Sequence, residues 1–224
     1  MKTYLKAVQA LIWKDLTAEW RTRENLTAML VFALLTVLIF NFALELDIQA
    51  QESLSAGILW VTFVFAGTIG LNRSMATEKD RGCLDGLLLA PVDRSVIYFG
   101  KMIVNIIFML LVEIIVLPIY SFLFHVPVFL PGFLLVVFLG SFGYVAVGTL
   151  LATMVIQVRT RDILLPILLF PLTLPVVIAA VKASQGFLEL LPITEISTWL
   201  NLLVVYDLIF IAVAFMVFDY VVEE

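Results

Sequence analysis

The chain has 224 residues, of which 63% are hydrophobic and only 14% are charged, and its mean hydropathy is +1.13. A soluble domain is about 45–50% apolar, so this composition excludes the ordinary soluble class. The formal net charge of -5 is spread along the chain, and no basic patch points to nucleic acid as a partner. We therefore expect an all-α membrane protein.

Six apolar segments are long enough to cross a bilayer, which takes about 20 residues in a helix. We expect these transmembrane spans at residues 26–44, 54–71, 101–122, 133–156, 163–181 and 199–222. The sequence has no internal repeat, low-complexity run or long linker between them. Residues 1–224 are therefore expected to form one domain, a compact bundle of helices.

Lys and Arg alternate between the two sides that these spans define. Three regions on one side carry nearly all of them: the residues before the first span, the connection between the second and third spans, and the connection between the fourth and fifth spans. The basic residues there are Lys2, Lys6, Lys14, Arg21, Arg23, Arg73, Lys79, Arg81, Arg94, Lys101, Arg159 and Arg161. The opposite connections carry a single basic residue, Lys182. Because cytoplasmic loops collect Lys and Arg, we expect a multi-pass protein with both termini in the cytoplasm.

Residues 1–25 precede the first span and have the pattern of an amphipathic helix. One broad sector of the helical wheel is apolar and is formed by Tyr4, Leu5, Val8, Leu11, Ile12, Trp13, Leu16 and Trp20. Lys6, Lys14 and Arg21 lie outside this sector, and Asp15 and Glu19 interrupt it. This pattern is typical of a helix that lies in the membrane interface and contacts lipid. The alternative is packing against a partner subunit.

Residues 72–95, between the second and third spans, form a longer connection than the fold requires. A charged run at 78–81 is followed by Gly82, a Leu-rich stretch and Pro91. The pattern predicts two short helices that meet at Gly82, because glycine ends or bends helices. A mixture of many charges and several leucines fits a surface that docks onto another cytoplasmic protein.

Two acidic residues, Glu113 and Asp207, fall inside the third and sixth expected spans. A carboxyl group at the bilayer centre costs about 2.5–3.5 kcal/mol on insertion scales, so each is expected to have a role. One hypothesis is a polar path for cargo. The alternative is hydrogen bonding between helices, with Tyr120, Tyr144 or Asn105 as the partner.

The fifth span carries three prolines, Pro166, Pro171 and Pro175. Each removes a backbone donor and clashes with the preceding turn, so we expect a kinked or broken helix, either re-entrant or hinged. Glycines in the fourth span predict close approach of neighbouring helices, at Gly140, Gly143 and Gly148. Cys83 is the only cysteine and His125 the only histidine, so no metal site is expected.

Two stretches resemble a known family. Residues 78–91 read Glu-Lys-Asp-Arg-Gly-Cys-Leu-Asp-Gly-Leu-Leu-Leu-Ala-Pro, which resembles the loop of the exporter-type transmembrane subunits of ABC transporters. Residues 170–175 read Phe-Pro-Leu-Thr-Leu-Pro, which is similar to a run in the fifth span of one family of these subunits. The chain thus resembles the CcmB family of haem exporter permeases, which act in cytochrome c maturation.

The resemblance implies an ABC permease domain with a cytoplasmic coupling helix between spans two and three. The residues that it assigns to ATPase coupling are Glu78, Asp80, Arg81, Gly82, Leu84, Asp85, Leu87 and Pro91. The sequence has no Gly-x-x-x-x-Gly-Lys-[Ser/Thr] phosphate loop, so a separate ABC ATPase subunit would bind ATP. Further partners would be a second copy of the permease and maturation proteins that handle haem, in the bacterial inner membrane.

The resemblance implies a non-catalytic subunit that acts in haem export or in release of a haem-loaded chaperone. An exporter permease for another cargo, such as lipid, polysaccharide or drug, is the alternative. A membrane enzyme that uses Glu113 and Asp207 is a weaker one, because no nucleophile or metal cluster accompanies them. His125 as a haem ligand is not favoured, since the sequence shows no second ligand.

Overall fold

The computed structural model describes residues 2–44, 48–80, 94–156, 158 and 160–221. Within these ranges all regular secondary structure is α-helical, and short turns connect the helices. The helices are α1 (Lys2–Thr22), α2 (Glu24–Leu44), α3 (Ile48–Asp80), α5 (Arg94–Phe124), α6 (Pro131–Val155), α7 (Arg161–Leu188) and α8 (Ile193–Val221). The all-α fold class is confirmed.

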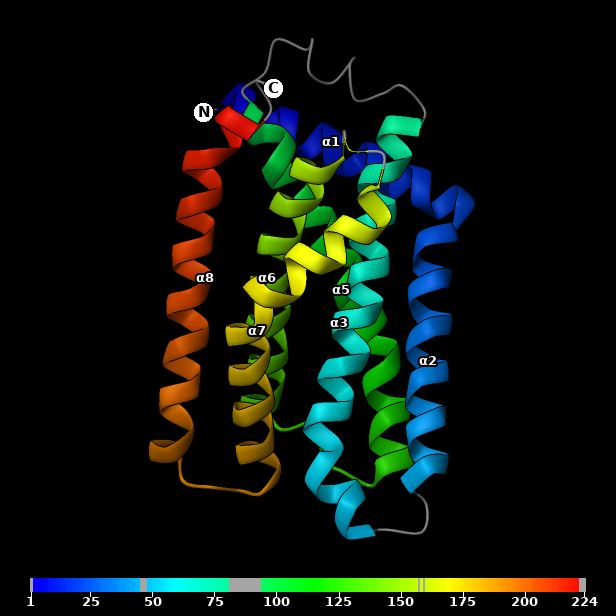
Figure 1. Cartoon of the computed structure of the whole chain (residues 1–224), viewed down its shortest axis with the longest axis vertical. Helices are drawn as coiled ribbons and strands as arrows, with labels where there is room; N and C mark the ends of the chain where they lie inside the picture. The colour runs from blue at the N-terminus through cyan, green and yellow to red at the C-terminus, as the bar shows by residue number, and fades with distance from the viewer. Residues whose placement is uncertain (1, 45–47, 81–93, 157, 159, 222–224) are drawn as a thin grey trace.

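Six of these helices run along the long axis of the bundle, and α1 lies across one end of it (Figure 1). Each of the six is long and apolar enough to cross a membrane, so the six expected spans are confirmed. Several helices extend past the expected limits, as α7 does at Leu188 and α8 at Ile193. Hydropathy locates the part of a helix that lies in lipid, whereas backbone hydrogen bonding decides where the helix ends.

The connection after the second span differs from its predicted form. Residues 72–80 continue α3 to Asp80. The prediction that the first of the two short helices is separate from the span is therefore wrong. The stretch contains no glycine or proline and includes good helix formers such as Met75, Ala76 and Lys79, so nothing stops the helix there. Glu78 and Asp80 lie in its last turn. The other expected coupling residues lie outside the described residues, namely Arg81, Gly82, Leu84, Asp85, Leu87 and Pro91.

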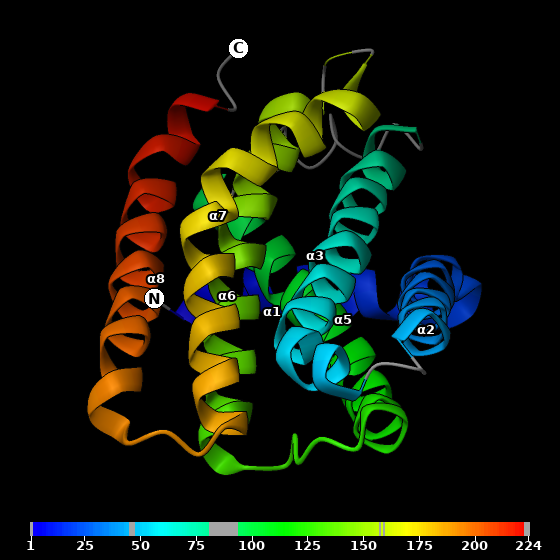
Figure 2. The same cartoon turned by 60° about the horizontal axis from the view of Figure 1, so that its bottom comes forward.

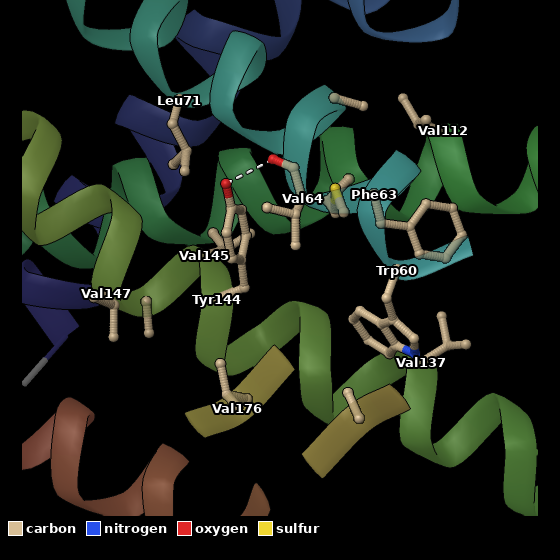
Figure 3. Packing of buried hydrophobic residues seen from close by; sticks show 14 of the residues in the cluster. Trp60, Phe63, Val64, Leu71, Val112, Val137, Tyr144, Val145, Val147 and Val176 are labelled. Carbon is tan, nitrogen blue, oxygen red and sulfur yellow. Dashed lines mark hydrogen bonds between the residues drawn. The ribbon is translucent and has the colours of Figure 1, made fainter. Parts of the chain in front are cut away.

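The helix α6 lies at the centre of the bundle and packs against α3, α5, α7 and α8. Figure 3 shows the core around Tyr144 of α6, whose hydroxyl donates to the carbonyl of Val64 at 2.7 Å. A Cβ atom at Gly140 would lie 2.2 Å from the Trp60 ring, and one at Gly148 would lie 2.2 Å from Leu71. The predicted close approach at the α6 glycines is therefore confirmed.

The helix α7 is continuous although it contains all three prolines. It changes direction part-way along its length, so that its two halves point differently in Figures 1 and 2. Proline removes a backbone donor and opens the preceding turn, which accounts for such a bend. Next to the bend, the hydroxyl of Tyr206 on α8 donates to the carbonyl of Leu172 at 2.9 Å. The neighbouring helix thus supplies a donor to the bent backbone.

Candidate functional site

Glu113 lies inside the bundle on α5, and only 2% of its surface is exposed. The hydroxyl of Ser141 on α6 donates to Glu113 Oε1. The second oxygen, Oε2, has no hydrogen-bond partner among the described residues. Glu113 therefore joins α5 to α6 and keeps one oxygen available to a further donor.

The expected hydrogen bond between helices is present at Glu113, but the three suggested partners are wrong, because they bind elsewhere. Tyr120 donates to the carbonyl of Ser55 at 2.6 Å, and Asn105 donates to Thr149 at 3.1 Å. Tyr144 bonds to α3, as described above. Tyr120 and Tyr144 thus join α5 and α6 to α3, whereas Asn105 joins α5 to α6 at a different level from Glu113. The rotation of each helix about its axis decides which polar groups meet.

Asp207 is the second buried carboxyl group, with 5% of its surface exposed on α8. Its Oδ1 lies 2.1 Å from the position that a Cβ atom would take at Gly143 of α6. Both oxygens of Asp207 lack a hydrogen-bond partner within the part of the chain that the structure describes. Gly143 thus leaves the space that the buried carboxyl group occupies.

The two carboxyl groups approach α6 from different sides. Ser141 and Gly143 are two positions apart, which places them on nearly opposite faces of a helix. Glu113 therefore approaches from α5 and Asp207 from α8. Paired carboxylates that share one substrate need to face each other, so this arrangement does not favour the enzyme hypothesis. Among the described residues, no three His, Cys, Asp or Glu side chains gather where they could hold a metal ion.

His125 is exposed and follows the last turn of α5. Its φ angle is 55°, in the left-handed region that often ends helices. The structure therefore gives His125 a place in a tight turn before α6. Ser121, one turn earlier, donates to the carbonyl of Val126 at 2.7 Å and closes the same turn.

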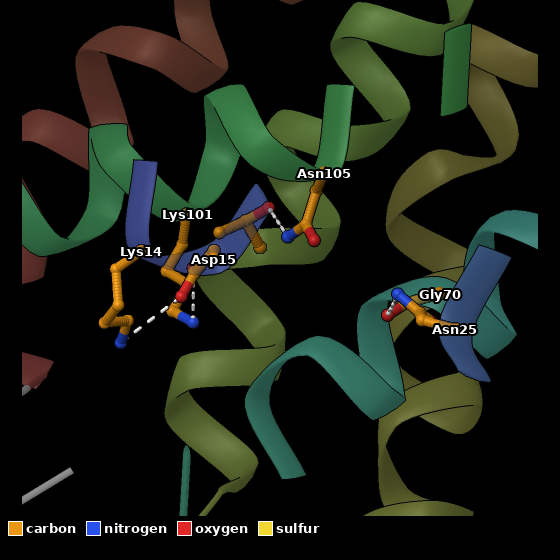
Figure 4. Close-up of polar contacts among 7 residues, drawn as sticks. Lys14, Asp15, Asn25, Gly70, Lys101 and Asn105 are labelled. Carbon is orange, nitrogen blue, oxygen red and sulfur yellow. Dashed lines mark hydrogen bonds and ion pairs between the residues drawn. The ribbon is translucent and has the colours of Figure 1, made fainter. Parts of the chain in front are cut away.

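A buried ion pair that the sequence analysis missed fastens α1 to α5. Lys101 Nζ lies 2.7 Å from Asp15 Oδ2, and the two side chains are 3% and 10% exposed (Figure 4). Lys14 lies on the outer side of the same carboxylate, at 3.2 Å. Close packing supports the pair, since a Cβ atom at Gly100 would lie 2.1 Å from Leu11. A signal was present, because Asp15 interrupts an apolar sector and Lys101 begins an apolar span.

The broad apolar sector of α1 meets two environments in the structure. Val8 and Leu11 are buried, whereas Trp13 and Trp20 are 73% and 75% exposed. The guanidinium of Arg23 lies 5.9 Å from the Trp20 ring centre, a cation–π contact. One apolar strip thus packs on the bundle, and the two tryptophans face away from it. Contact of the outer strip with lipid stays a prediction.

A sequence model of the CcmB protein family matches residues 6–223 of the chain. The chain belongs to the CcmB family. It is similar to the Heme exporter protein B of Pseudomonas aeruginosa, with 24% identity over 85% of this chain and 86% of the relative. The Heme exporter protein B of Rhodobacter capsulatus is 26% identical over 76% of this chain and 79% of the relative. That of Bradyrhizobium diazoefficiens is 24% identical over 81% and 82%.

The contact between Gly143 and Asp207 in this CcmB-family chain can be tested by a double-mutant cycle. We expect Gly143→Ala to destabilise the protein by about 1–3 kcal/mol, because the added methyl group overlaps Asp207 Oδ1. The same change should be nearly neutral when Asp207 is replaced by Ala. Thermal unfolding in detergent measures both effects. Gly57→Ala is the matched control, because a Cβ atom there has no neighbour within 4 Å. An equal loss in both backgrounds would contradict the contact.

Proposed function

We propose that this chain is the transmembrane permease subunit of an ABC transporter that acts in haem export during cytochrome c maturation. The observation that carries the proposal is the match of the CcmB family over residues 6–223, together with relatives named Heme exporter protein B. Six membrane-spanning helices fit a permease. The chain acts without catalysing a reaction itself.

The energy for transport comes from ATP hydrolysed by a separate ABC ATPase subunit. This part of the proposal is supported by the absence of a phosphate loop from the sequence. The ATPase docks on the 72–95 segment, through the residues that the resemblance assigns to coupling. Two ATPase subunits pair with two copies of the permease, since closed symmetric assemblies are the commonest. Maturation proteins that handle haem complete the complex.

The protein lies in the bacterial inner membrane with both termini in the cytoplasm. The distribution of Lys and Arg supports this orientation. It places α1 and the end of α3 on the cytoplasmic side, since both lie at the same end of the bundle (Figure 1). Trp13 and Trp20 then lie at the level of the lipid headgroups, where tryptophan is favoured.

Glu113 and Asp207 supply polar contacts along the path of the cargo. The support is physical, because both carboxyl groups are buried and retain oxygens without a partner among the described residues. A buried polar group without a partner is costly, and a partner that arrives during transport removes that cost. The bend of α7, which contains Pro166, Pro171 and Pro175, acts as a hinge in the same cycle.

Haem staining of membrane c-type cytochromes tests the proposed function. Cells that lack the gene should lose the stain, and a plasmid copy of the gene should restore it. The matched control is a plasmid copy that is truncated after residue 44 and encodes only α1 and α2. Normal staining in the deleted strain would reject a role in cytochrome c maturation. An exporter permease for lipid, polysaccharide or drug would then be the better hypothesis.

A further inference from the structure

The helix α3 is much longer than a membrane crossing requires. It has 33 residues, which span about 50 Å, whereas the hydrocarbon core is about 30 Å thick. Its apolar stretch ends at Ala76, and the helix continues to Asp80. This last part lies at the α1 end of the bundle and leads directly to residue 81 (Figure 1).

Two side chains near the end of α3, Asn72 and Lys79, contact both sides of the corner between α6 and α7. Asn72 Nδ2 donates to Asp162 Oδ1 at 3.1 Å, and Lys79 Nζ donates to the carbonyl of Ile156 at 2.8 Å. Asn72 and Lys79 are seven residues apart, which places them on one face of α3. Ile156 caps the end of α6, and Asp162 lies in the first turn of α7.

The two contacts differ in burial, since the bond of Lys79 is part-buried and the bond of Asn72 is exposed, but both lie at the ends of helices. The last carbonyls of a helix have no partner within it, so Lys79 satisfies a group of α6 and places positive charge at the negative end of its dipole. Asp162 places negative charge at the positive end of α7. On another side of α3, Arg73 Nη1 donates to the carbonyl of Glu24 at 3.0 Å, where α2 begins. The end of α3 is thus bonded to α2, α6 and α7.

Of the helices joined at this end, α7 is the one that bends. Its backbone contains Pro166, Pro171 and Pro175, and prolines weaken the hydrogen-bond ladder of a helix. The far half of α7 is held to α3, because Trp60 Nε1 donates to Ser184 Oγ at 2.9 Å. The far half of α7 is therefore fixed to α3. When the first turn of α7 is displaced, the helix bends in the region of its prolines.

We propose that Asn72 and Lys79 are positioning residues that carry a displacement of the α3 end into the corner between α6 and α7, Lys79 through the end of α6 and Asn72 through the first turn of α7. The inference rests on the proposed function, in which a docked ATPase supplies that displacement next to residue 81. The contacts themselves are independent of any docking geometry. Their removal should leave the bundle folded and should separate ATP hydrolysis from transport.

The test uses the whole complex in cells that lack the chromosomal gene. Asn72→Asp places two carboxylates against each other, and we expect it to lower mature c-type cytochrome about five- to tenfold, a typical size for a coupling effect. In the double variant with Asp162→Asn, the amide at position 162 donates to the new carboxylate at position 72. The amount of mature c-type cytochrome should therefore recover. The amount of permease in the membrane, and of ATPase that copurifies with it, should stay at the wild-type level.

Lys79→Ala should give a similar loss, because it leaves the carbonyl of Ile156 without its donor. The matched controls are Lys182→Ala and Asn201→Ala, which remove exposed side chains of the same types elsewhere. Normal cytochrome in Asn72→Asp and Lys79→Ala, beside a working wild-type copy, overturns the inference alone. Loss without recovery in the double variant, or loss of the permease from the membrane, also overturns it. A wild-type copy that fails to restore the stain overturns the proposed function, and the inference with it.

Discussion

Lys101→Ala is expected to release α1 from the rest of the bundle. The change leaves the carboxylate of Asp15 in a 10% exposed position without its 2.7 Å partner. Removing one partner of a buried ion pair costs about 3–5 kcal/mol when the remaining charge has no other partner. Lys14 stays 3.2 Å from the carboxylate of Asp15, so we expect a loss at or below the lower end of this range. Trypsin measures the release, since Lys6 and Lys14 on α1 become easier to cleave once the helix leaves its site.

Two further variants separate the charge from the packing. Asp15→Leu combined with Lys101→Met should restore protection from trypsin, because replacing a whole buried pair by apolar groups is often neutral or stabilising. Lys182→Ala removes an exposed lysine far from α1 in the sequence, and trypsin should cleave α1 in this variant as slowly as in the wild type. Wild-type protection in Lys101→Ala would show that α1 docks without the ion pair.

Trp60→Ala is expected to give the largest loss of stability among single substitutions in the core. Trp60 is 1% exposed, and its ring fills the space that Gly140 leaves on α6. Truncation creates a cavity and removes the donor to Ser184, at a cost of about 3–5 kcal/mol. Thermal unfolding of the purified protein in detergent should show a clear drop in midpoint.

Trp60→Phe tests which part of the tryptophan matters. It keeps an aromatic ring between α3 and α6 but lacks the indole N–H, so we expect a loss of about 1–3 kcal/mol, the cost of leaving a buried polar group without its partner. Val61→Ala is the matched control, since Val61 is exposed on the same turn of α3. A midpoint for Trp60→Ala equal to that of Val61→Ala would show that the ring is not part of the core.

The spans could be predicted from the sequence because crossing a bilayer imposes a length and a composition that any helix must meet. The close approach of helices at the α6 glycines could also be predicted, since small residues in a span indicate close packing. These are local properties. The prediction of a separate short helix over residues 72–80 was wrong. Gly82 suggested that a new helix follows the span, but residues 72–80 are good helix formers and continue α3.

Contacts between helices could not be predicted in the same way. Ser141 was not expected as the partner of Glu113, because serine is common in spans and nothing in the sequence gives the rotation of α5 against α6. Asp15 and Lys101 each looked unusual, yet their pairing depends on where α1 lies across the bundle. The match between Gly143 and Asp207 likewise exists only once α8 is placed beside α6.

The ion pair between Asp15 and Lys101 has a consequence for biosynthesis. The ribosome makes α1 first, but its partner helix α5 follows only after α2 and α3. During that interval α1 can contact α2, through the bond of the Leu26 amide to Glu19, but its site on α5 does not yet exist. Asp15 can form its ion pair only after the chain has been made as far as Lys101. We therefore expect α1 to dock on α5 only after α2 and α3 have been made.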